Sequence, residues 1–431
     1  MSIYAELERC EAERCPVRVA VVGTGFFGGG LVRQLCRLPG LVPAVVANRT
    51  LERAIAALVA GGVAPGDIVV CTDPAEADAA LARGQYVATR SVLLPAHVAS
   101  IHVVMEATGD VLVGAAVAVE ALHQGKHVVA ANLETQATVG PVLQQMAEMA
   151  GVVYSDVDGD QPGLLKQLYD YVRTLGLTPV VAGNCKGVLK RYATPATQEA
   201  FARAHGLQPW IAAAAADGTK LNIEMAVVAN ATGMRPAVTG MVGPETTLAS
   251  VLTDFEQRGL LAAGPIVEYT LGIPNGVFVI GHSADPAVHR EFRYLKMGDG
   301  PYYLLYRPQV LCHYEAPLSA AEAALHRCAT IAPRGRPVAE VVAYAKRDLR
   351  AGQRLDGIGG FDCYGLIMAA DDAGRADLLP IGLAGFARLT RDIAQDAPIP
   401  QCAVAFDEDN LVLALRRRQS RLGLAVPAGA G

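Results

Sequence analysis

A glycine-rich motif at residues 23–28 is the strongest chemical signal in the sequence. It contains three glycines and two phenylalanines, namely Gly23, Gly25, Phe26, Phe27 and Gly28. Between a strand and a helix, such glycines allow a tight turn, close approach of a pyrophosphate to the backbone, and close packing of helix on strand. The helix N-terminus then holds the phosphates. Because an apolar run at 17–22 directly precedes the motif, we predict dinucleotide binding rather than an unrelated glycine-rich turn.

The identity of the cofactor is read about 20 residues further on, at the end of the second expected strand. An acidic residue there would bind the ribose 2′-hydroxyl of NAD, but this sequence has Asn48, Arg49 and Thr50. Arg49 offers a cation and a fork of donors that suit a 2′-phosphate, and Asn48 and Thr50 add further donors. We therefore predict NADP(H). The alternative is that Arg49 is a solvated residue at a helix start, where its charge opposes the helix dipole.

Two lysines have the chemistry that carbonyl reduction needs, a proton donor and a positive charge beside the developing alkoxide. Lys186 and Lys220 both lie in polar, glycine-containing stretches that follow apolar residues. A helix through the second stretch would place Asp217, Lys220 and Glu224 on one face. We predict Lys186, Asp217 and Lys220 as catalytic. The alternatives are an exposed ion pair without chemistry for Asp217 and Lys220, and an ordinary turn lysine for Lys186.

Three aspartates alternate along the chain at Asp156, Asp158 and Asp160. On an extended segment, all three side chains would point the same way. Carboxylate oxygens suit Mg²⁺ or Mn²⁺, which can chelate and polarise a hydroxyketone. The cluster therefore predicts a metal site. The alternatives are a solvated acidic turn and aspartates that bind substrate hydroxyls without a metal.

The elements that would position these groups follow an α/β pattern over residues 1–160. Short apolar runs alternate with helical patterns, and the expected strands are 17–22, 42–47, 67–71, 101–105 and 126–130. Such alternation gives right-handed crossovers and a parallel sheet whose strands are buried on both faces. The sequence therefore predicts an N-terminal Rossmann domain with a parallel sheet over residues 1–160.

The pattern becomes less regular beyond residue 160. Residues 266–270 and 277–281 flank a Gly/Pro turn and are expected to be antiparallel strands. A Pro/Arg-rich linker follows at 332–337 and leads into a strand-rich segment. We predict an α+β substrate and dimerisation domain over 161–332, in a homodimer or higher homo-oligomer, and a β-rich third domain over 338–420.

Composition excludes several classes of protein. The 37 Lys and Arg against 42 Asp and Glu give a net charge of −5, which argues against nucleic acid as a partner. The hydrophobic fraction is 52%, but the longest apolar stretch, near 111–122, contains Glu120 and is too short to cross a membrane. The nine cysteines form no CxxC pair, and the first residues lack the apolar core of a signal peptide. We expect a cytoplasmic protein that acts on a small molecule.

Residues 103–109 and 121–132 together resemble the cofactor domain of homoserine dehydrogenases. The resemblance covers roughly residues 17–160. It implies that Ala107, Thr108 and Gly109 lie beside the nicotinamide ribose and that the strand leading to Asn132 ends at the active site. Two departures put homoserine as substrate in doubt: Leu133 replaces a lysine, and the family's glycine-rich substrate turn is replaced by the aspartate-containing stretch at 155–163.

A closer resemblance is to homoserine-dehydrogenase-like proteins that end in a SAF domain, which include deoxyxylulose-phosphate reductoisomerase-like enzymes. The stretches that carry it are 183–187, 216–220, 228–233 and 342–355. It implies an NADPH-dependent oxidoreductase for a small polyhydroxylated, often phosphorylated, sugar-like carbonyl compound, with a coupled isomerisation in some members. A homoserine dehydrogenase-type alcohol dehydrogenase and a non-catalytic nucleotide- or carbohydrate-binding protein are the alternatives.

Overall fold

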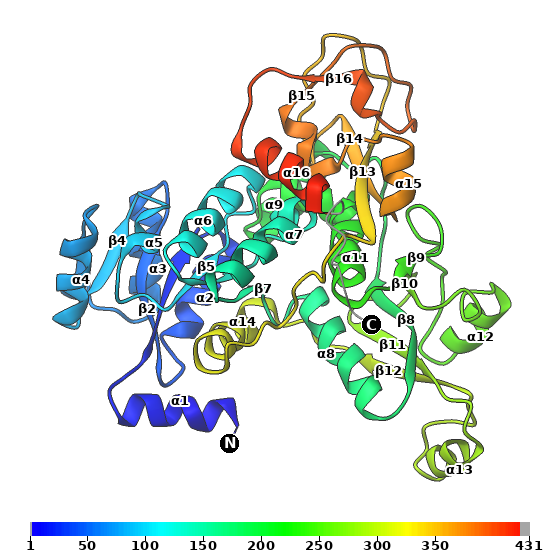
Figure 1. Cartoon of the computed structure of the whole chain (residues 1–431), viewed down its shortest axis with the longest axis horizontal. Helices are drawn as coiled ribbons and strands as arrows, with labels where there is room; N and C mark the ends of the chain where they lie inside the picture. Colours follow the sequence, from blue (N-terminus) through cyan, green and yellow to red (C-terminus); the bar gives the residue numbers. More distant parts are fainter. Residues whose placement is uncertain (1, 423–431) are drawn as a thin grey trace. The chain divides into compact units, whose positions relative to one another are not determined.

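The computed structural model describes residues 2–422, and the chain forms two compact units. The first unit contains Met1–Asp160, Leu311–Ala332 and Asn410–Gly431, and the second contains Gln161–Val310 and Pro333–Asp409. The sequence predicts three parts, whereas here residues 311–332 belong with the N-terminal unit and residues 333–409 with the middle of the chain. Figure 1 shows the elements of both units.

The first unit is built on a seven-stranded sheet in the order β3-β4-β2-β1-β5-β6-β7, and all its strand pairs are parallel. The strands are β1 Val17–Val22, β2 Leu41–Ala47, β3 Ile68–Val70, β4 Tyr86–Thr89, β5 Val103–Glu106, β6 His127–Ala130 and β7 Tyr154–Asp156. The predicted parallel sheet is confirmed. Sequence patterns missed β4 and β7, which have four and three residues.

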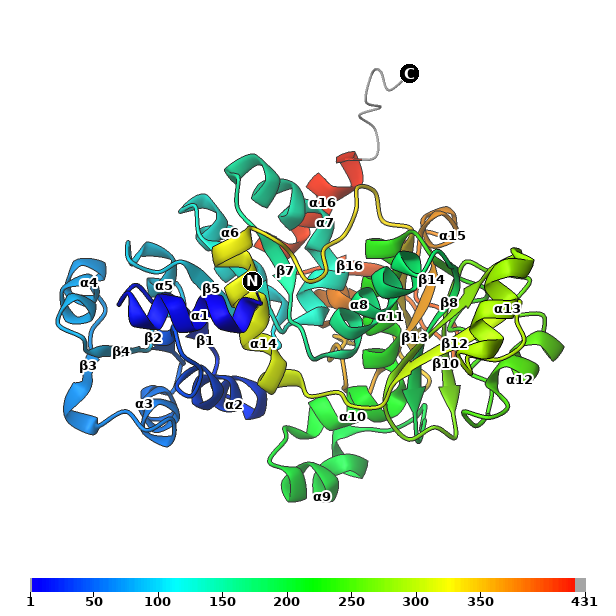
Figure 2. The ribbon, with the colours of Figure 1, turned by 90° about the horizontal axis from the view of Figure 1, so that it is seen from below.

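Helices cover this sheet and connect its strands. They are α1 Ile3–Ala12, α2 Phe26–Leu35, α3 Leu51–Ala60, α4 Pro74–Ala82, α5 Leu94–His97, α6 Val111–His123, α7 Leu133–Ala150, α14 Cys312–Ala321 and α16 Leu411–Leu422. Figures 1 and 2 show α14 beside α2, although the two are far apart in the sequence, and α16 packs on α6 and α7. None of the helices between residues 2 and 422 has the length and apolarity needed to cross a membrane.

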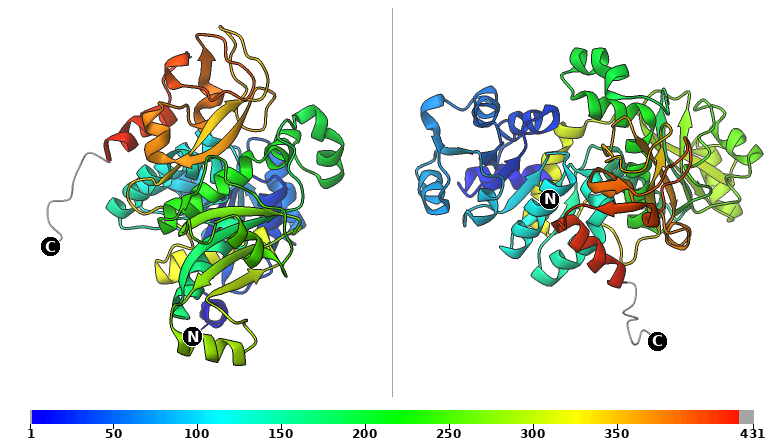
Figure 3. Two further views of the ribbon diagram at one scale, coloured as in Figure 1. Left: turned by 90° about the vertical axis from the view of Figure 1, so that its right-hand side faces the viewer. Right: turned by 90° about the horizontal axis from the view of Figure 1, so that it is seen from above.

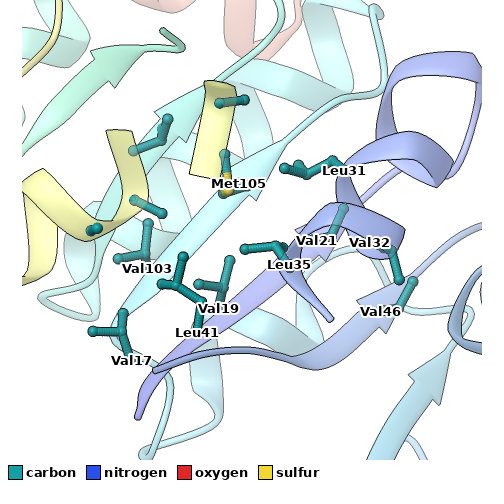
Figure 4. Packing of buried hydrophobic residues seen from close by; sticks show 14 of the residues in the cluster. Val17, Val19, Val21, Leu31, Val32, Leu35, Leu41, Val46, Val103 and Met105 are labelled. Carbon is teal, nitrogen blue, oxygen red and sulfur yellow. The ribbon is translucent and has the colours of Figure 1, made fainter. Parts of the chain in front are cut away.

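The core of the first unit explains why its strands are apolar along their whole length. Val19 and Val21 of β1 are 0% exposed, and Leu31 and Leu35 of α2 pack against them. Figure 4 shows these side chains meeting Met105 of β5. Each fully buried Val or Leu side chain contributes about 1.5–3 kcal/mol, so this core fixes the positions at which the strands end.

The second unit is built on a mixed five-stranded sheet in the order β12-β11-β8-β10-β9. Its strands are β8 Thr178–Lys186, β9 Arg235–Pro236, β10 Ile266–Leu271, β11 Val277–His282 and β12 Tyr302–Arg307. The two expected antiparallel strands exist as β10 and β11 but do not pair with each other. Strand β8 lies between them, parallel to β10 and antiparallel to β11.

Helices and two small strand pairs complete the second unit. The helices are α8 Gln161–Thr174, α9 Pro195–His205, α10 Pro209–Asp217, α11 Thr219–Thr232, α12 Val251–Gln257, α13 Pro286–Tyr294 and α15 Ala370–Arg375. The strand pairs are β13 Ala339–Ala345 with β14 Cys363–Ala369, and β15 Ala387–Leu389 with β16 Val404–Phe406. Both β13 and β14 contact α11, and Figure 3 shows the orange strands above the green helices.

Candidate functional site

The glycines of the 23–28 turn each have a distinct structural reason. Gly23 has φ +94°, and a Cβ there would lie 2.7 Å from the carbonyl oxygen of Ala107. A Cβ on Gly28 would collide with the backbone oxygen of Gly23. Gly25, the N-cap of α2, has no atom within 4 Å of its Cβ position. The first and third glycines therefore allow tight packing, and the second leaves open space at the helix N-terminus, where a phosphate binds well.

The predicted cofactor-selecting residues lie at the carboxyl end of β2, next to this turn. The Asn48 side-chain amide donates a 2.6 Å hydrogen bond to the Thr24 hydroxyl, and Asn48 Oδ1 accepts from the Thr50 backbone N–H at 2.9 Å. Arg49 is exposed and makes no hydrogen bond or ion pair with the described residues. Its guanidinium is therefore available to a ligand.

A second arginine, which sequence analysis missed, lies at the same edge of the sheet. Strand β4 pairs with β2 so that Thr89 is opposite Ala47, and Arg90 therefore follows at the carboxyl ends of both strands. Arg90 contacts Glu52 at 3.5 Å, and both side chains are largely exposed. Only the pairing of β4 with β2 reveals this position, because Arg90 is 41 residues from Arg49 in the sequence.

The third group of predicted cofactor residues lies on β5 and β6. Ala107 and Thr108 touch the Gly23 turn, and Gly109 has φ +70°. Asn132 is 0% exposed: its side-chain amide donates to the Asp110 carbonyl at 3.0 Å, and its Oδ1 accepts from the Thr135 N–H at 3.1 Å. Asn132 therefore fixes the end of the 107–110 turn through its hydrogen bond to the Asp110 carbonyl.

Glu106, the last residue of β5, is a buried acid that sequence analysis did not single out. It is 1% exposed, and its Oε1 accepts hydrogen bonds from the Thr108 backbone N–H at 2.7 Å and from the Thr108 hydroxyl. Burial raises the pKa of Glu106 to about 7, against the lowering effect of these hydrogen bonds. A carboxyl that titrates near neutrality thus supports the turn next to the glycine-rich motif.

The three aspartates predicted to bind a metal lie at and just beyond the end of β7. Strand β7 ends at Asp156, and Gly159, with φ +78°, turns the chain, so Asp158 and Asp160 do not continue an extended segment. Asp158 Oδ1 instead accepts from the Gly159 N–H at 2.6 Å. Within residues 2–422, no three His, Cys, Asp or Glu side chains are arranged to hold a metal ion. The extended segment on which the metal prediction relied therefore ends at Asp156.

In the second unit, Lys186 and Lys220 are both half-buried and lie at the same end of β8 and α11. Asn184, two residues before Lys186 on the same strand face, donates a 2.7 Å hydrogen bond to Glu224, one turn after Lys220. Just beyond β8, the Lys190 N–H donates to the Ala216 carbonyl at 2.7 Å, close to the start of α11. The two predicted lysines thus extend from one joined strand and helix.

Asp217 has a different environment from the one predicted. Helix α10 ends at Asp217 and Gly218 has φ +89°, so Asp217 and Lys220 are on different helices and do not share a face. Asp217 Oδ1 accepts from the Thr219 N–H at 2.7 Å, and Oδ2 pairs with Lys346 at 2.9 Å. Asp217 is therefore engaged in a buried ion pair that local sequence did not indicate.

A family model matches part of the chain. Residues 159–316 match the model described as oxidoreductase DRL, catalytic domain, a span that includes Lys186 and Lys220. No curated protein matches the sequence.

Several solved structures resemble the chain distantly. A homoserine dehydrogenase from Thiobacillus denitrificans shares 15% identity, with 89% of this chain and 97% of that chain covered and a TM-score of 0.44. A 1-deoxy-D-xylulose 5-phosphate reductoisomerase from Zymomonas mobilis, in complex with NADPH, shares 15% identity over 71% and 80%, with a TM-score of 0.38. An oxidoreductase from Agrobacterium radiobacter, in complex with NAD+, L-tartaric acid and magnesium, shares 13% over 40% and 44%, with a TM-score of 0.29. The chain thus spans less than half of that last protein.

The site and the family model agree on the class of protein. The first unit is a parallel sheet with a complete dinucleotide-binding turn, and the middle of the chain matches an oxidoreductase catalytic domain. The chain is therefore an NAD(P)-dependent oxidoreductase of the Rossmann dehydrogenase type. The non-catalytic alternative does not hold.

Proposed function

We propose that this protein is an NADPH-dependent oxidoreductase that reduces a small polyhydroxylated, phosphorylated, sugar-like carbonyl compound. The observation that carries the proposal is the convergence of three predicted groups at one edge of the sheet. The glycine turn touches Ala107 and is hydrogen-bonded to Asn48, which leaves the neighbouring Arg49 exposed. The glycine turn suits a pyrophosphate, Arg49 suits a 2′-phosphate, and the turn at Ala107 suits a nicotinamide ribose.

Arg49 supports NADP(H) over NAD(H). A free guanidinium at the carboxyl end of β2 offers two or more parallel donors to a phosphate, and Arg90 brings a second positive charge to the same edge. Asn48 has a single acceptor oxygen, which already accepts from Thr50, whereas an acidic residue offers two oxygens to the ribose hydroxyls. Charge and hydrogen-bonding capacity both favour the phosphorylated cofactor.

The cofactor proposal is tested by calorimetric titration of NADPH and NADH into wild-type protein and the Arg49→Ala variant. We expect Arg49→Ala to weaken NADPH binding by about 10- to 100-fold, which corresponds to the loss of one charge-assisted hydrogen-bonded pair, and to leave NADH nearly unchanged. Arg37→Ala is the matched control, since Arg37 is exposed near the start of β2, at the opposite edge of the sheet. Equal losses for both cofactors would reject this role of Arg49.

Reduction of a carbonyl requires a hydride at carbon and a proton at oxygen. NADPH supplies the hydride when bound, and we assign the proton to Lys220, with Lys186 as the positive charge that stabilises the developing alkoxide. Asp217 acts in this proposal as a positioning residue, because its contact with the Thr219 N–H fixes the start of α11 one residue before Lys220. No step is assigned to a metal, since Asp156, Asp158 and Asp160 do not form a ligand set.

The substrate class is tested by following NADPH absorbance with aldose, ketose and sugar-acid phosphates, with product analysis to detect any isomerisation. Lys220→Met should lower kcat by about 100-fold or more, as expected for loss of a general acid. Lys190→Met is the control, because Lys190 is an exposed lysine of the same segment. Oxidation of homoserine by NADP+, with no turnover of any phosphate ester, would favour the homoserine dehydrogenase-type alternative.

A further inference from the structure

A group of buried polar side chains lies behind the 107–109 turn, on the face of the first sheet that α6 and α7 cover. We call Glu106, Gln136, Tyr154 and Asp156 the buried acid cluster; their exposed fractions are 1%, 3%, 1% and 1%. Gly114 of α6 is closely packed against it, since a Cβ there would lie 2.9 Å from Glu106 Oε2. The cluster is therefore enclosed by sheet and helices.

Strand register places the acids of the cluster on one face. Glu106 pairs with Ala130 of β6, and Ala130 pairs with Asp156 of β7. Residues paired in a parallel sheet project to the same side, and Tyr154, two residues before Asp156, projects with them.

Six polar atoms of this cluster have no hydrogen-bond partner within 3.5 Å, although Gln136 lies close enough to Asp156, and Asn132 close enough to Glu106, to lower the pKa of each carboxyl. They are Glu106 Oε2, both side-chain polar atoms of Gln136, the Tyr154 hydroxyl and both carboxyl oxygens of Asp156. Buried polar atoms in folded proteins are almost always paired with protein or with internal water. Such a concentration in one enclosed polar region indicates a site for water and exchangeable protons.

The charged groups recorded near Glu106 are acidic, and Arg416 of α16 donates to the Thr138 carbonyl of α7. Glu134 of α7 raises the pKa of Glu106, and Tyr154 and Asp156 of β7 and Asp160 beyond it lie in the same region. The neighbouring strands present Val22 and Ala130, and α6 presents Gly114. Burial first, and then Asp160 and Glu134, raise the pKa of Asp156 well above its ordinary value.

The strand order indicates which part of the cofactor lies near Glu106. The chain passes from β1 through β2, β3 and β4 on one side and returns to β5 on the other, so β1 and β5 flank the point at which the strand order reverses. A dinucleotide binds across this point with its adenosine half over β2. The nicotinamide half therefore lies on the β5 side, next to the turn whose Thr108 donates two hydrogen bonds to Glu106.

We propose that Glu106 is a proton-exchange site coupled to the charge of the nicotinamide ring, so that binding of the oxidised cofactor expels a proton from Glu106 and binding of the reduced cofactor does not. The inference rests on the proposed function, because it requires a nicotinamide dinucleotide at this edge. It adds to the cofactor site a buried carboxyl, Glu106, whose proton exchanges when the cofactor binds.

The direction of the effect follows from the charges. The nicotinamide ring is positive in the oxidised cofactor and neutral in the reduced one, so only the oxidised form favours the ionised carboxylate of Glu106. Protonated protein plus NADP+ gives the NADP+ complex of the ionised protein plus one proton, which leaves through the water of the cluster. Proton release on binding makes NADP+ binding tighter as the pH rises.

The test uses the ratio of the dissociation constants of NADP+ and NADPH for the wild-type protein between pH 6 and pH 8.5. The ratio cancels the titration of the 2′-phosphate, which both cofactors share. We expect it to fall by at least about fivefold as the pH rises, the lower end of ordinary coupling between two sites. A constant ratio would overturn the inference and leave the proposed function intact, whereas failure of both nucleotides to bind would overturn both.

Two further measurements identify the residue. Glu106→Gln keeps an oxygen that accepts from Thr108 and should make the ratio independent of pH, while Glu148→Gln, an exposed change on the last turn of α7, should behave as wild type. Calorimetry of the wild-type protein in two buffers of different ionisation enthalpy counts the protons directly. NADP+ should release more protons than NADPH at pH 7; equal counts, or an unchanged ratio profile in Glu106→Gln, would reject Glu106 as the site.

Discussion

Asp217 of the second unit and Glu106 of the first unit are both buried carboxyls, but they have different partners. In the second unit, Asp217 pairs with Lys346, whose ammonium also donates to the carbonyls of Ala193 and Gly360 at 2.8 and 2.7 Å. The ammonium thus has three acceptors, and its side chain is 2% exposed. Burial raises the pKa of Asp217 above its ordinary value, although Lys346 and the Thr219 N–H act in the opposite direction.

Glu106 and Asp156 of the first unit have no cation among the groups that shift their pKa values. One oxygen of Glu106 accepts from Thr108, and neither its other oxygen nor either oxygen of Asp156 has a hydrogen-bond partner within 3.5 Å. Asn132 and Gln136 lie close enough to lower the pKa of these two carboxyls. A buried carboxyl without a cation shifts towards its neutral form. Asp217 is therefore a buried acid that fixes local structure, whereas Glu106 and Asp156 are buried acids whose protonation can still change.

The largest effect is expected from breaking the buried Asp217–Lys346 ion pair. Lys346→Met should destabilise the second unit by about 3–5 kcal/mol, because it leaves the Asp217 carboxyl buried without its partner. Urea unfolding followed by the fluorescence of Trp210, the single tryptophan of the chain, measures this directly, since Trp210 lies on α10.

The control for this change is Arg203→Met, which breaks an exposed ion pair with Glu199 in the same unit and should cost less than about 1 kcal/mol. Adding Asp217→Asn to Lys346→Met should recover part of the lost stability, since it removes the carboxyl left without its partner. Similar losses for Lys346→Met and Arg203→Met would show that the buried pair is not a special constraint.

A smaller effect of opposite sign, a gain in stability, is expected from removing the Glu106 carboxyl. Because the pKa of Glu106 rises from 4.5 to about 7 on folding, the native state holds a proton that the unfolded state loses between these values. Stability from this group is therefore present below about pH 4.5 and is lost as the pH rises to about 7, by about 3 kcal/mol. Glu106→Gln removes this loss, so the variant should be more stable than wild type at pH 8.

Hydrogen exchange of the β5 and β6 amides, measured for variant and wild type at the same pH, reports this difference in the first unit. We expect slower exchange in Glu106→Gln at pH 8 and little difference at pH 5. Faster exchange at pH 8 would mean that the ionised carboxylate is stabilised by groups other than those seen around it. That result would remove the contrast between the two units.

The first unit was largely predictable because its signals are local. A glycine turn between an apolar run and a helix is read from adjacent residues, and strands buried on both faces are apolar throughout. Strands β4 and β7 were missed because they are short and contain polar residues, and Arg90 was missed with β4. Glu106 ends an apolar strand, and only the packing of α6 and α7 shows that it is buried without a cation.

The second unit was less predictable because its contacts are distant in sequence. Asp217 and Lys346 are 129 residues apart, so no spacing rule connects them. Spacing alone placed Asp217 on the helix of Lys220, although Gly218 between them is the kind of residue that ends helices. The resemblance of residues 342–355 to the start of a SAF domain stays a prediction. Within this stretch, Lys346 contacts the Ala193 carbonyl and Asp217 and so fixes the α10–α11 corner.

The smallest expected effect tests how closely the buried acid cluster is enclosed. Gly114→Ala improves helix propensity by about 1 kcal/mol, but the new Cβ would lie 2.5 Å from both Asn132 Nδ2 and Thr135 Oγ1. Both atoms donate to carbonyls, those of Asp110 and Val111, so moving them costs hydrogen bonds. We expect a net loss of about 1–2 kcal/mol.

Gly374→Ala, on α15 with open space around its Cβ position, should instead stabilise by about 0.5–1 kcal/mol. If thermal unfolding showed both variants stabilised alike, the cluster would have room to spare, and the six unpaired atoms could then rearrange to satisfy one another without water or proton exchange.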